Sequence, residues 1–390
     1  MRSAVESRGI MAMTPLMAAL AGIVAVIIFS SSFGGTRYVV AVMIGAFAGF
    51  ALYHASFGFT AAWRRIVTEK RGHGLRAQML LLVLACAITY PLLAYGAPDL
   101  GDWVTLRSGG FVFSFGVAAA IGSFMFGMGM QLGGGCGSGT LFTVGGGSTR
   151  MVVTLAAFIA GSLIATAHLP WWNTLPRFDR FSLVSNFGPA LAFVLLLLFA
   201  AGVYFWTRSV ELKAHGTLEQ PRSTGSLFRG PWAPVLGALA LVVVSVATIL
   251  TLGRPWGITS GFALWGAKIA NVAGVDIASW PYWRGQMGRV ERSVFADATS
   301  IMNFGIIFGA MAASVLAGKF SPKLNIGWVP LMTAIIGGLM MGYGARLSFG
   351  CNIGAYLGGI VSGSLHGWWW AVFAFAGSSI MARIKVRYGL

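Results

Sequence analysis

Long apolar runs dominate this sequence and limit it to folds that can exist inside a lipid bilayer. A helix needs about 20 apolar residues to cross the roughly 30 Å hydrocarbon core of a bilayer. Ten runs approach that length, and they occupy residues 11–30, 38–57, 78–97, 110–130, 151–168, 189–207, 232–252, 301–318, 329–345 and 367–382. Several are short or interrupted by glycine, so the sequence predicts an all-α polytopic membrane protein with about eight to eleven crossings.

The number and positions of the charged residues support a membrane protein and argue against a nucleic-acid-binding protein. Only 9% of the residues are charged, whereas soluble domains carry roughly 25%. The net charge of +17 could indicate a nucleic-acid-binding protein, but the basic residues lie in short loops beside the apolar runs. We therefore predict no nucleic-acid partner and interpret these residues as a topology signal, with attraction of anionic lipid or an anionic solute as the alternative.

The positions of Lys and Arg also predict an orientation. They concentrate in the loop 64–77, in the linker 208–230 and at 383–387 near the C-terminus. Because cytoplasmic loops of membrane proteins carry an excess of these residues, we expect all three regions to face the cytoplasm. The segment 97–108 carries two Asp and one Arg and is expected on the opposite side. The first apolar run has no clear cleavage site and is expected to be an ordinary helix.

A repeated cysteine segment indicates that the chain is built from two related halves, 1–207 and 231–390, joined by the hydrophilic linker 208–230. "FGMGMQLGGGCGSG" at 126–139 aligns with "MGYGARLSFGCNIG" at 341–354 at a constant spacing, 351 − 136 = 215 residues. The aligned pairs are Gly127 with Gly342, Gly129 with Gly344, Gly135 with Gly350, Cys136 with Cys351 and Gly139 with Gly354. Membrane proteins with two related halves often bind their solute near the midplane, where interrupted helices meet.

Glycine runs predict where those interruptions lie. Three consecutive glycines occur at 133–135 and three more at 145–147. Each glycine weakens a helix by roughly 1 kcal/mol relative to alanine. We therefore favour broken helices and dipping loops there over close helix packing. Close packing through small residues is the preferred interpretation for "GAFAGFALY" at 45–53.

The two cysteine turns combine groups suited to a sulfur-containing anion. Unwound backbone inside a membrane must be buried by protein or line a polar cavity, and N–H groups at glycine turns and helix starts form an anion cradle. A cysteine adds a soft sulfur with a weak S–H donor. The predicted path residues of the two turns are Gly134, Gly135, Cys136, Gly137, Ser138, Gly350, Cys351 and Asn352.

Other polar residues are interpreted with less specificity. Arg346 and its repeat partner Gln131 flank the two turns, and either they attract an anion at the mouth of the path or Arg346 extends to the membrane interface. Cys86 is predicted to be a small buried hydrophobe. Three cysteines without a CxxC spacing predict neither a disulfide framework nor a zinc site, so no cofactor is expected. Four residues are predicted to lie in the core or at the interface: Lys268, His54, His168 and His366.

These motifs resemble those of the YeeE/YedE family of bacterial inner-membrane sulfur transport proteins. The resemblance rests on "GARLSFGCNIGAYLGGIVSGSLHGWWW" at 344–370, on its twin "GMGMQLGGGCGSGTLFTVGGGS" at 127–148, and on "GRPWGITSGFALWGAK" at 253–268. It extends over nearly the whole chain.

The resemblance implies uptake of thiosulfate, or a related sulfur compound, across the inner membrane. It also implies an hourglass-like helical fold of two inverted halves, in which dipping loops bring Cys136 and Cys351 to a central constriction. Family members often carry a third cysteine in a segment like 54–65, where this chain has Gly58. Some work with a small cytoplasmic sulfur carrier of the TusA type, which is a possible partner here.

Two enzymatic functions compete with transport. "CGSG" at 136–139 approaches the nucleophile turn of intramembrane serine proteases, but its repeat copy lacks the serine. A membrane-embedded thiol redox enzyme or sulfurtransferase could use Cys136 and Cys351 as an exchanging pair. We predict a transporter and not an enzyme.

Overall fold

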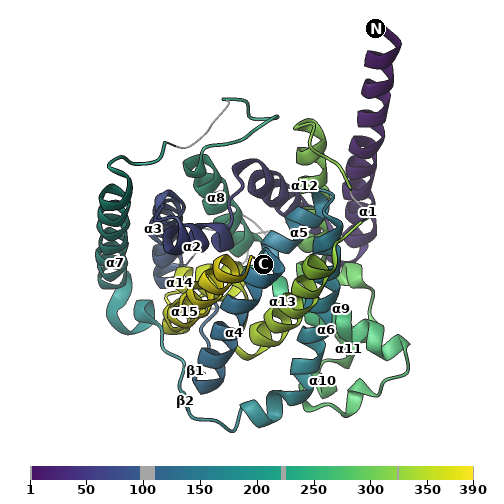
Figure 1. The fold of residues 1–390 in the computed structure, drawn as a ribbon. Helices are drawn as coiled ribbons and strands as arrows, with labels where there is room; N and C mark the ends of the chain where they lie inside the picture. The colour runs from purple at the N-terminus through teal and green to yellow at the C-terminus, as the bar shows by residue number, and fades with distance from the viewer. Residues whose placement is uncertain (1, 97–109, 221–224, 323–324, 390) are drawn as a thin grey trace.

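The computed structural model describes residues 2–96, 110–220, 225–322 and 325–389, with side chains from residue 14 onward. It is an α-helical bundle (Figure 1). Eight helical segments within the described residues are long and apolar enough to cross a membrane. The predicted all-α polytopic class is therefore confirmed. The segment 97–108, which we expected opposite the basic loops, lies outside the described residues.

The half before the linker contains seven helices and two short strands among its described residues. They are α1 (Arg2–Ala55), α2 (Phe59–Thr68), α3 (His73–Tyr95), β1 (Phe115–Gly116), α4 (Val117–Gly133), α5 (Gly137–Gly145), α6 (Thr149–Trp172), β2 (Arg177–Phe178) and α7 (Leu183–His215). The two strands pair antiparallel, with Phe115 opposite Phe178. Two of the predicted runs, 11–30 and 38–57, are joined in α1, which bends at Gly35 with φ 55°.

The half after the linker contains the remaining elements. They are α8 (Pro234–Leu252), α9 (Ile258–Val272), η1 (Ile277–Ser279), α10 (Pro281–Arg284), α11 (Met287–Glu291), η2 (Val294–Ala296), α12 (Ala298–Leu316), α13 (Trp328–Leu347), η3 (Asn352–Leu357), α14 (Gly358–Val361) and α15 (Leu365–Tyr388). Adding 215 to the bounds of α4, α5 and α6 gives 332–348, 352–360 and 364–387. These ranges nearly coincide with α13, with η3 plus α14, and with α15.

Small residues allow the long helices to approach one another closely. A Cβ at Gly45 or Gly49 of α1 would collide with the backbone of α12 at Met302 or Ile306, respectively. This is the close packing predicted for 45–53. The helices α4 and α13 meet in the same way, since a Cβ at Gly129 would lie 2.8 Å from the backbone oxygen of Gly337.

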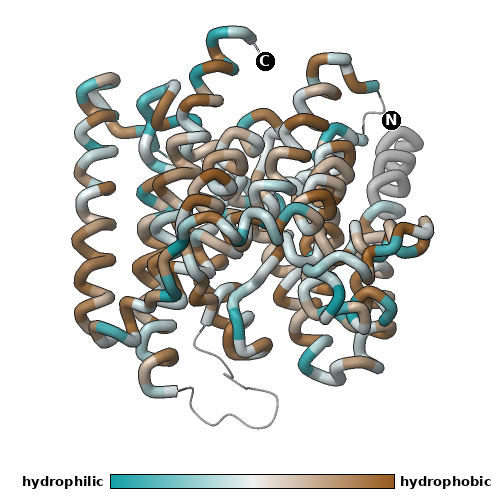
Figure 2. The backbone as a smooth tube through the Cα atoms, turned by 90° about the horizontal axis from the view of Figure 1, so that it is seen from below, coloured by the Kyte–Doolittle hydropathy of each residue, from teal (hydrophilic) through white to brown (hydrophobic). Residues whose placement is uncertain are grey.

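The outer faces of the bundle are apolar and exposed. On α7, Leu198 and Phe205 are 66% and 67% exposed, and on α1 Ile28 is 62% exposed. Figure 2 shows α7 at the left edge, apolar along most of its length and hydrophilic toward one end. Large exposed apolar surfaces of this kind are typical of contact with lipid.

The three basic regions gather at one end of the bundle. Arg76, at the start of α3, pairs with Glu211 near the end of α7 at 2.7 Å. Lys385 of α15 donates to the backbone oxygen of Gln131, and the Gln131 side chain donates to the backbone oxygen of Thr60 in α2. Contacts therefore join the loop 64–77 directly to the linker, and join the C-terminal region through Gln131 to α2, the helix that leads into that loop.

Candidate functional site

The first cysteine turn interrupts the chain between α4 and α5. Gly134 adopts a left-handed conformation with φ 91°, which glycine occupies without the steric penalty of a Cβ. At Gly135 a Cβ would lie 3.1 Å from the backbone carbon of Gly139, so this position also favours glycine. Cys136 follows with extended backbone and is the N-cap residue of α5. The predicted helix break is therefore present, and the cysteine lies at the start of the second helix.

The second cysteine turn has the same form in the other half. Cys351 is the N-cap residue of η3, which continues into α14, and its ψ of −168° nearly equals the −167° of Cys136. Gly350 precedes it with φ 157°, and a Cβ there would lie 2.8 Å from the backbone nitrogen of Ala355. The left-handed position equivalent to Gly134 is Phe349, with φ 62°.

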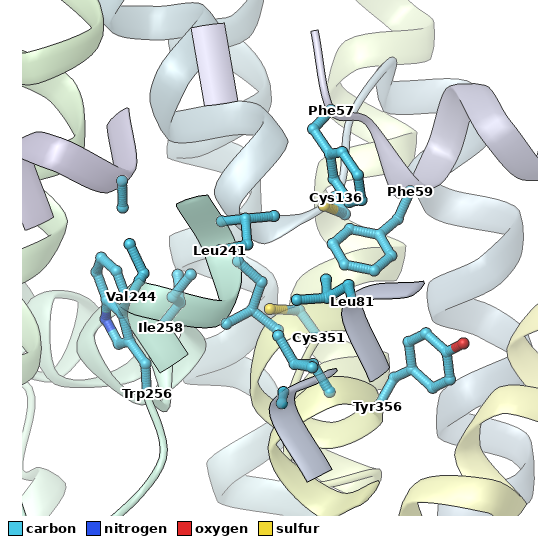
Figure 3. Close-up of a cluster of buried hydrophobic side chains, with 14 of the residues drawn as sticks. Phe57, Phe59, Leu81, Cys136, Leu241, Val244, Trp256, Ile258, Cys351 and Tyr356 are labelled. Carbon is cyan, nitrogen blue, oxygen red and sulfur yellow. The ribbon is translucent and has the colours of Figure 1, made fainter. Parts of the chain in front are cut away.

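The two turns meet in the interior of the protein. Cys136 and Cys351 are 2% and 0% exposed, and both thiols are free. A Cβ at Gly137 would lie 3.0 Å from Cys351 Sγ, so the second thiol lies directly against the first turn. Figure 3 shows both cysteines within one cluster of buried apolar side chains that includes Phe57 and Phe59.

Backbone N–H groups surround each sulfur in the same arrangement. The N–H groups of Ser138 and Gly139 lie on the side of the turn near Cys136 Sγ. Those of Ile353 and Gly354, which are the repeat equivalents, lie in the same way near Cys351 Sγ. Helices begin directly after both cysteines, and the first N–H groups of a helix carry partial positive charge. The arrangement therefore favours an anion beside the two thiols.

Two further predicted path residues differ in their hydrogen bonding. Ser138 Oγ lies 3.5 Å from Cys136 Sγ. Asn352 is completely buried, and neither its Oδ1 nor its Nδ2 has a hydrogen-bond partner among the described residues. An unpartnered buried amide costs about 1–3 kcal/mol. A polar solute that reached Asn352 would reduce that cost.

A large cavity with four arginines opens toward the second turn. This arginine cavity has a volume of about 680 Å³ and includes Arg37, Arg254, Arg289 and Arg346 in its lining. Asp297 is the one acidic side chain among its described lining residues, so the formal charge is +4 − 1 = +3. Asp297 pairs with Arg289 at 3.2 Å, whereas Arg254 and Arg346 form no ion pair with any described residue.

Arg346 connects the arginine cavity to the thiols. Its Nη2 donates to Thr259 Oγ1 at 3.0 Å, and the Thr259 methyl group would lie 3.4 Å from a Cβ at Gly137. Its Nε is buried without a partner in the described part of the chain. The structure therefore places Arg346 close to the first cysteine turn, with Thr259 between them.

Gln131, the repeat partner of Arg346, lies elsewhere. It is 2% exposed, and its Nε2 donates to the Thr60 backbone oxygen and to Ser378 Oγ at 3.0 and 2.7 Å. Both amide hydrogens are therefore used within the protein, and the structure does not bring Gln131 together with Arg346. The repeat symmetry of the sequence could not reveal this difference, because it depends on which helices pack around each residue.

A second cavity lies at the basic end of the bundle. This linker cavity has a volume of about 510 Å³ and is lined by residues at the end of α1, by α2, by the start of α3 and by the linker. Its charged groups are paired, since Glu219 contacts Arg65 at 3.0 Å and His73 at 2.8 Å. Burial acts to raise the pKa of Glu219, but hydrogen bonds from Arg65 and His73 and their charges hold this pKa below its usual value.

Gly58, where the sequence departs from the resembled family, lines the linker cavity between α1 and α2. The nearest heavy atom to a Cβ there would be 3.5 Å away, so a side chain would fit. Cys86 lies instead in α3, completely buried, with its Sγ 3.8 Å from the backbone oxygen of Ile360 in α14. Cys86 thus contacts the helix that follows the second turn, a proximity that the sequence did not indicate.

Four polar residues were predicted to lie in the core or at the interface, and two of them, Lys268 and His168, have hydrogen-bond partners. Lys268 donates to the backbone oxygens of Val290 and Arg292. His54 and His366 are buried, as expected, and His168 contacts the Tyr343 hydroxyl at 2.9 Å. No cluster of His, Cys, Asp or Glu among the described residues could hold a metal ion.

Comparison with known proteins adds independent information. A family model described as sulphur transport matches residues 54–380. The chain is 32% identical over 155 residues to "Probable transporter YedE" of Escherichia coli (strain K12), a match that covers 40% of this chain and 38% of that protein. It is 26% identical over 362 residues to "Thiosulfate transporter TsuA" of Spirochaeta thermophila, covering 88% of this chain and 98% of the relative. "Thiosulfate transporter TsuA" of Escherichia coli (strain K12) is 24% identical over 353 residues, covering 85% and 90%.

Proposed function

Because this chain belongs to the sulphur transport family, we propose that it carries thiosulfate, or a related sulfur-containing anion, across a bacterial inner membrane. The observation on which the proposal rests is the meeting of two thiols at the starts of two short helices. The names of the TsuA relatives support thiosulfate as the solute.

Each part of thiosulfate has a suitable partner at the two turns. Its oxygens accept hydrogen bonds from the N–H groups of Ser138, Gly139, Ile353 and Gly354. Its terminal sulfur is soft and polarizable and meets the S–H groups of Cys136 and Cys351. These thiols stay protonated during passage, because a thiolate would repel the anion and is costly to bury. Asn352 supplies a further donor beside Cys351.

The two cavities provide the ends of the path. Pro234, the first residue of α8, lines the linker cavity, and Leu252, its last residue, lines the arginine cavity. A helix of 19 residues is about 28 Å long, which is close to the thickness of a bilayer core. The cavities therefore lie at opposite ends of α8, and Leu241 and Val244 in the middle of that helix belong to the same buried cluster as the two thiols (Figure 3). Anions enter from the arginine cavity, where the guanidinium groups of Arg254 and Arg346 attract them.

The antiparallel packing of α4 and α13 supports an inverted relation between the two halves. Gly122, near the start of α4, lies against Leu347, the last residue of α13, while Gly133 at the end of α4 lies against Gly337 in the middle of α13. Equivalent helices that pack antiparallel are expected when the halves are related by an axis in the membrane plane. The basic end of the bundle, with the C-terminus, then faces the cytoplasm.

The closeness of the thiols also favours a second candidate, a membrane-embedded sulfurtransferase. In that reaction the sulfur–sulfur bond of thiosulfate breaks, the terminal sulfur joins a cysteine sulfur as a persulfide, and sulfite leaves with the bonding electron pair. The thiol proton passes to the released sulfite or to solvent. The two candidates differ in whether thiosulfate arrives intact.

Uptake into vesicles that contain only the purified protein separates them. Thiosulfate labelled at its terminal sulfur should accumulate intact, and a cysteine-free variant with Cys86, Cys136 and Cys351 all replaced by Ala serves as the control. Sulfate, sulfite and selenite added in excess report selectivity. Release of unlabelled sulfite with label retained on the protein would favour the sulfurtransferase. Accumulation in vesicles that contain this protein and no other would also show that a TusA-type carrier is not required.

A further inference from the structure

A third cavity lies near the linker cavity, away from the cysteine turns. This histidine cavity has a volume of about 280 Å³ and lies between the end of α1, the start of α6 and the end of α12. It shares Ser56 and Pro231 with the lining of the linker cavity. The transport path proposed above does not use it.

The charged groups that line the histidine cavity are all basic. Arg229 and Lys319 reach it from the linker and from the chain after α12, and no acidic side chain is present among its described lining residues. Two exposed cations alone would be an ordinary topology signal. Their convergence on one concave site with no carboxylate makes that site attractive to an anion.

The start of α6 supplies backbone donors to the same cavity. Ser148 is the N-cap residue of this 24-residue helix, lines the cavity and makes no side-chain cap hydrogen bond. The first N–H groups of an α-helix have no partner inside the helix, and the aligned peptide dipoles make that end positive. Anions are commonly bound at such positions.

His54 is an independent sign of a ligand. It lines the cavity, is 3% exposed, and its buried Nε2 has no partner among the described residues. The other ring nitrogen faces Gly230, where a Cβ would lie 2.5 Å from Nδ1, so Nε2 lies on the ring edge away from Gly230. The ring is held by stacking on Trp232 at 5.6 Å and by the edge of Phe50 at 4.5 Å. A fixed, buried ring nitrogen without a partner is unfavourable unless a ligand satisfies it, and an oxyanion does so in the tautomer that carries the proton on Nε2.

We propose that the histidine cavity binds a tetrahedral oxyanion, with Arg229 and Lys319 as counter-ions, the start of α6 as backbone donor and His54 Nε2–H as the buried donor. A free phosphate or sulfate ion has this chemistry, and so does the phosphate of an anionic lipid headgroup. The site is separate from the thiols, and its occupancy does not depend on which solute the protein transports.

Phosphate binding to the purified full-length protein tests the proposal. Phosphate should raise the midpoint of thermal unfolding at constant ionic strength, with chloride as the balancing anion. The double variant Lys319→Gln, Arg229→Gln should lower the affinity for phosphate by about tenfold or more, because two charge-assisted contacts are lost. The phosphate concentration needed to raise the unfolding midpoint should increase by the same factor. Lys213→Gln, which removes an exposed charge on α7, is the matched control and should leave binding unchanged.

A second measurement distinguishes the two sources of the oxyanion and does not depend on the protein's transport activity. Native mass spectrometry of protein from bilayers of phosphatidylglycerol and phosphatidylcholine reports retained anionic lipid. Retention that is lost in the double variant, but not in Lys213→Gln, supports the site with a lipid headgroup as its ligand. Phosphate stabilisation that is lost in the same variant supports it with a free ion. If neither ligand distinguishes the double variant from the control, the proposal is wrong.

Discussion

The two cysteine turns have related backbones but different surroundings, and the helix that follows is an α-helix after Cys136 and a π-helix after Cys351. Both place a cysteine at the start of a short helix with N–H groups around the sulfur. They differ at the left-handed residue, which is Gly134 in one turn and Phe349 in the other. They also differ just before the turn, where Gln131 is hydrogen-bonded inside the protein and Arg346 lines the arginine cavity. The two halves share a thiol with backbone N–H groups near it. They differ in the side chains around the turn, because different helices pack against each one.

Phe349 illustrates how the second turn is held. A non-glycine residue in the left-handed region costs roughly 1–2 kcal/mol. Here the ring stacks on Phe113 with centroids 4.6 Å apart and an interplanar angle of 6°, and such pairs contribute about 0.5–1.5 kcal/mol beyond their buried area. The stacking offsets the backbone strain and ties the turn to the wall of the arginine cavity, which Phe113 and Phe349 both line.

Removing the thiol of the first turn should have the largest effect. Cys136→Ala removes an S–H donor to a charged solute, a contact worth about 1.5–3 kcal/mol, so thiosulfate uptake should fall by about tenfold to a hundredfold. Cys136→Ser, which keeps a donor but not the sulfur, should give a smaller loss. Initial uptake rates in protein-only vesicles, at matched protein amounts, measure both. Unchanged uptake in Cys136→Ala combined with Cys351→Ala would remove the thiols from the mechanism.

Removing the thiol of the second turn should have a smaller effect. Cys351→Ala loses the same donor, but the neighbouring Asn352 carries two amide hydrogens without partners among the described residues and can take over part of the contact. Uptake should drop by about threefold to tenfold. Adding Asn352→Leu to Cys351→Ala should then lower uptake to the level of Cys136→Ala. If Cys351→Ala alone reaches that level, the asymmetry between the turns is absent.

The left-handed residue of the first turn should affect stability. Gly134→Ala places a Cβ at φ 91° and within 3.2 Å of Arg150 Nη1, and we expect a loss of about 1–2 kcal/mol in the free energy of unfolding. Gly202→Ala is the matched control, because Gly202 lies inside α7 and a Cβ there would have no neighbouring atom within 4 Å. It should raise stability slightly, since alanine is the better helix former. Thermal unfolding in detergent micelles compares the two variants.

The smallest effect is expected at the third cysteine. Cys86→Ala removes a buried sulfur whose hydrogen bond to the Ile360 backbone oxygen is long at 3.8 Å. Uptake should stay within about twofold of the unsubstituted protein, although Cys86 lies against the helix of the second turn. A loss as large as that of Cys351→Ala, at normal protein levels, would add Cys86 to the path.

Much of the fold could be predicted from the chain alone. The apolar runs indicated the membrane class, and all but one of them overlap the eight described segments that are long and apolar enough to cross a bilayer; the exception is 367–382, within α15. Glycine runs located the helix breaks, because successive glycines support a helix poorly. The different surroundings of Arg346 and Gln131 could not be predicted in this way, because the two residues occupy equivalent positions of the repeat and only the helices packed around them differ. The same holds for His54, whose missing partner is visible only once the helices are packed.

The sequence by itself determined the features that follow from local chemistry: which segments prefer lipid, where helices break, and that two thiols occupy equivalent turns. These depend on side-chain hydrophobicity, on glycine's lack of a Cβ and on a repeat that can be counted. The tertiary structure alone decided which groups meet across long separations. It placed Cys351 against Gly137, Cys86 against Ile360 and Arg346 in a cavity with three other arginines. Such contacts arise from close packing between helices that are distant in the chain, and no local pattern encodes them.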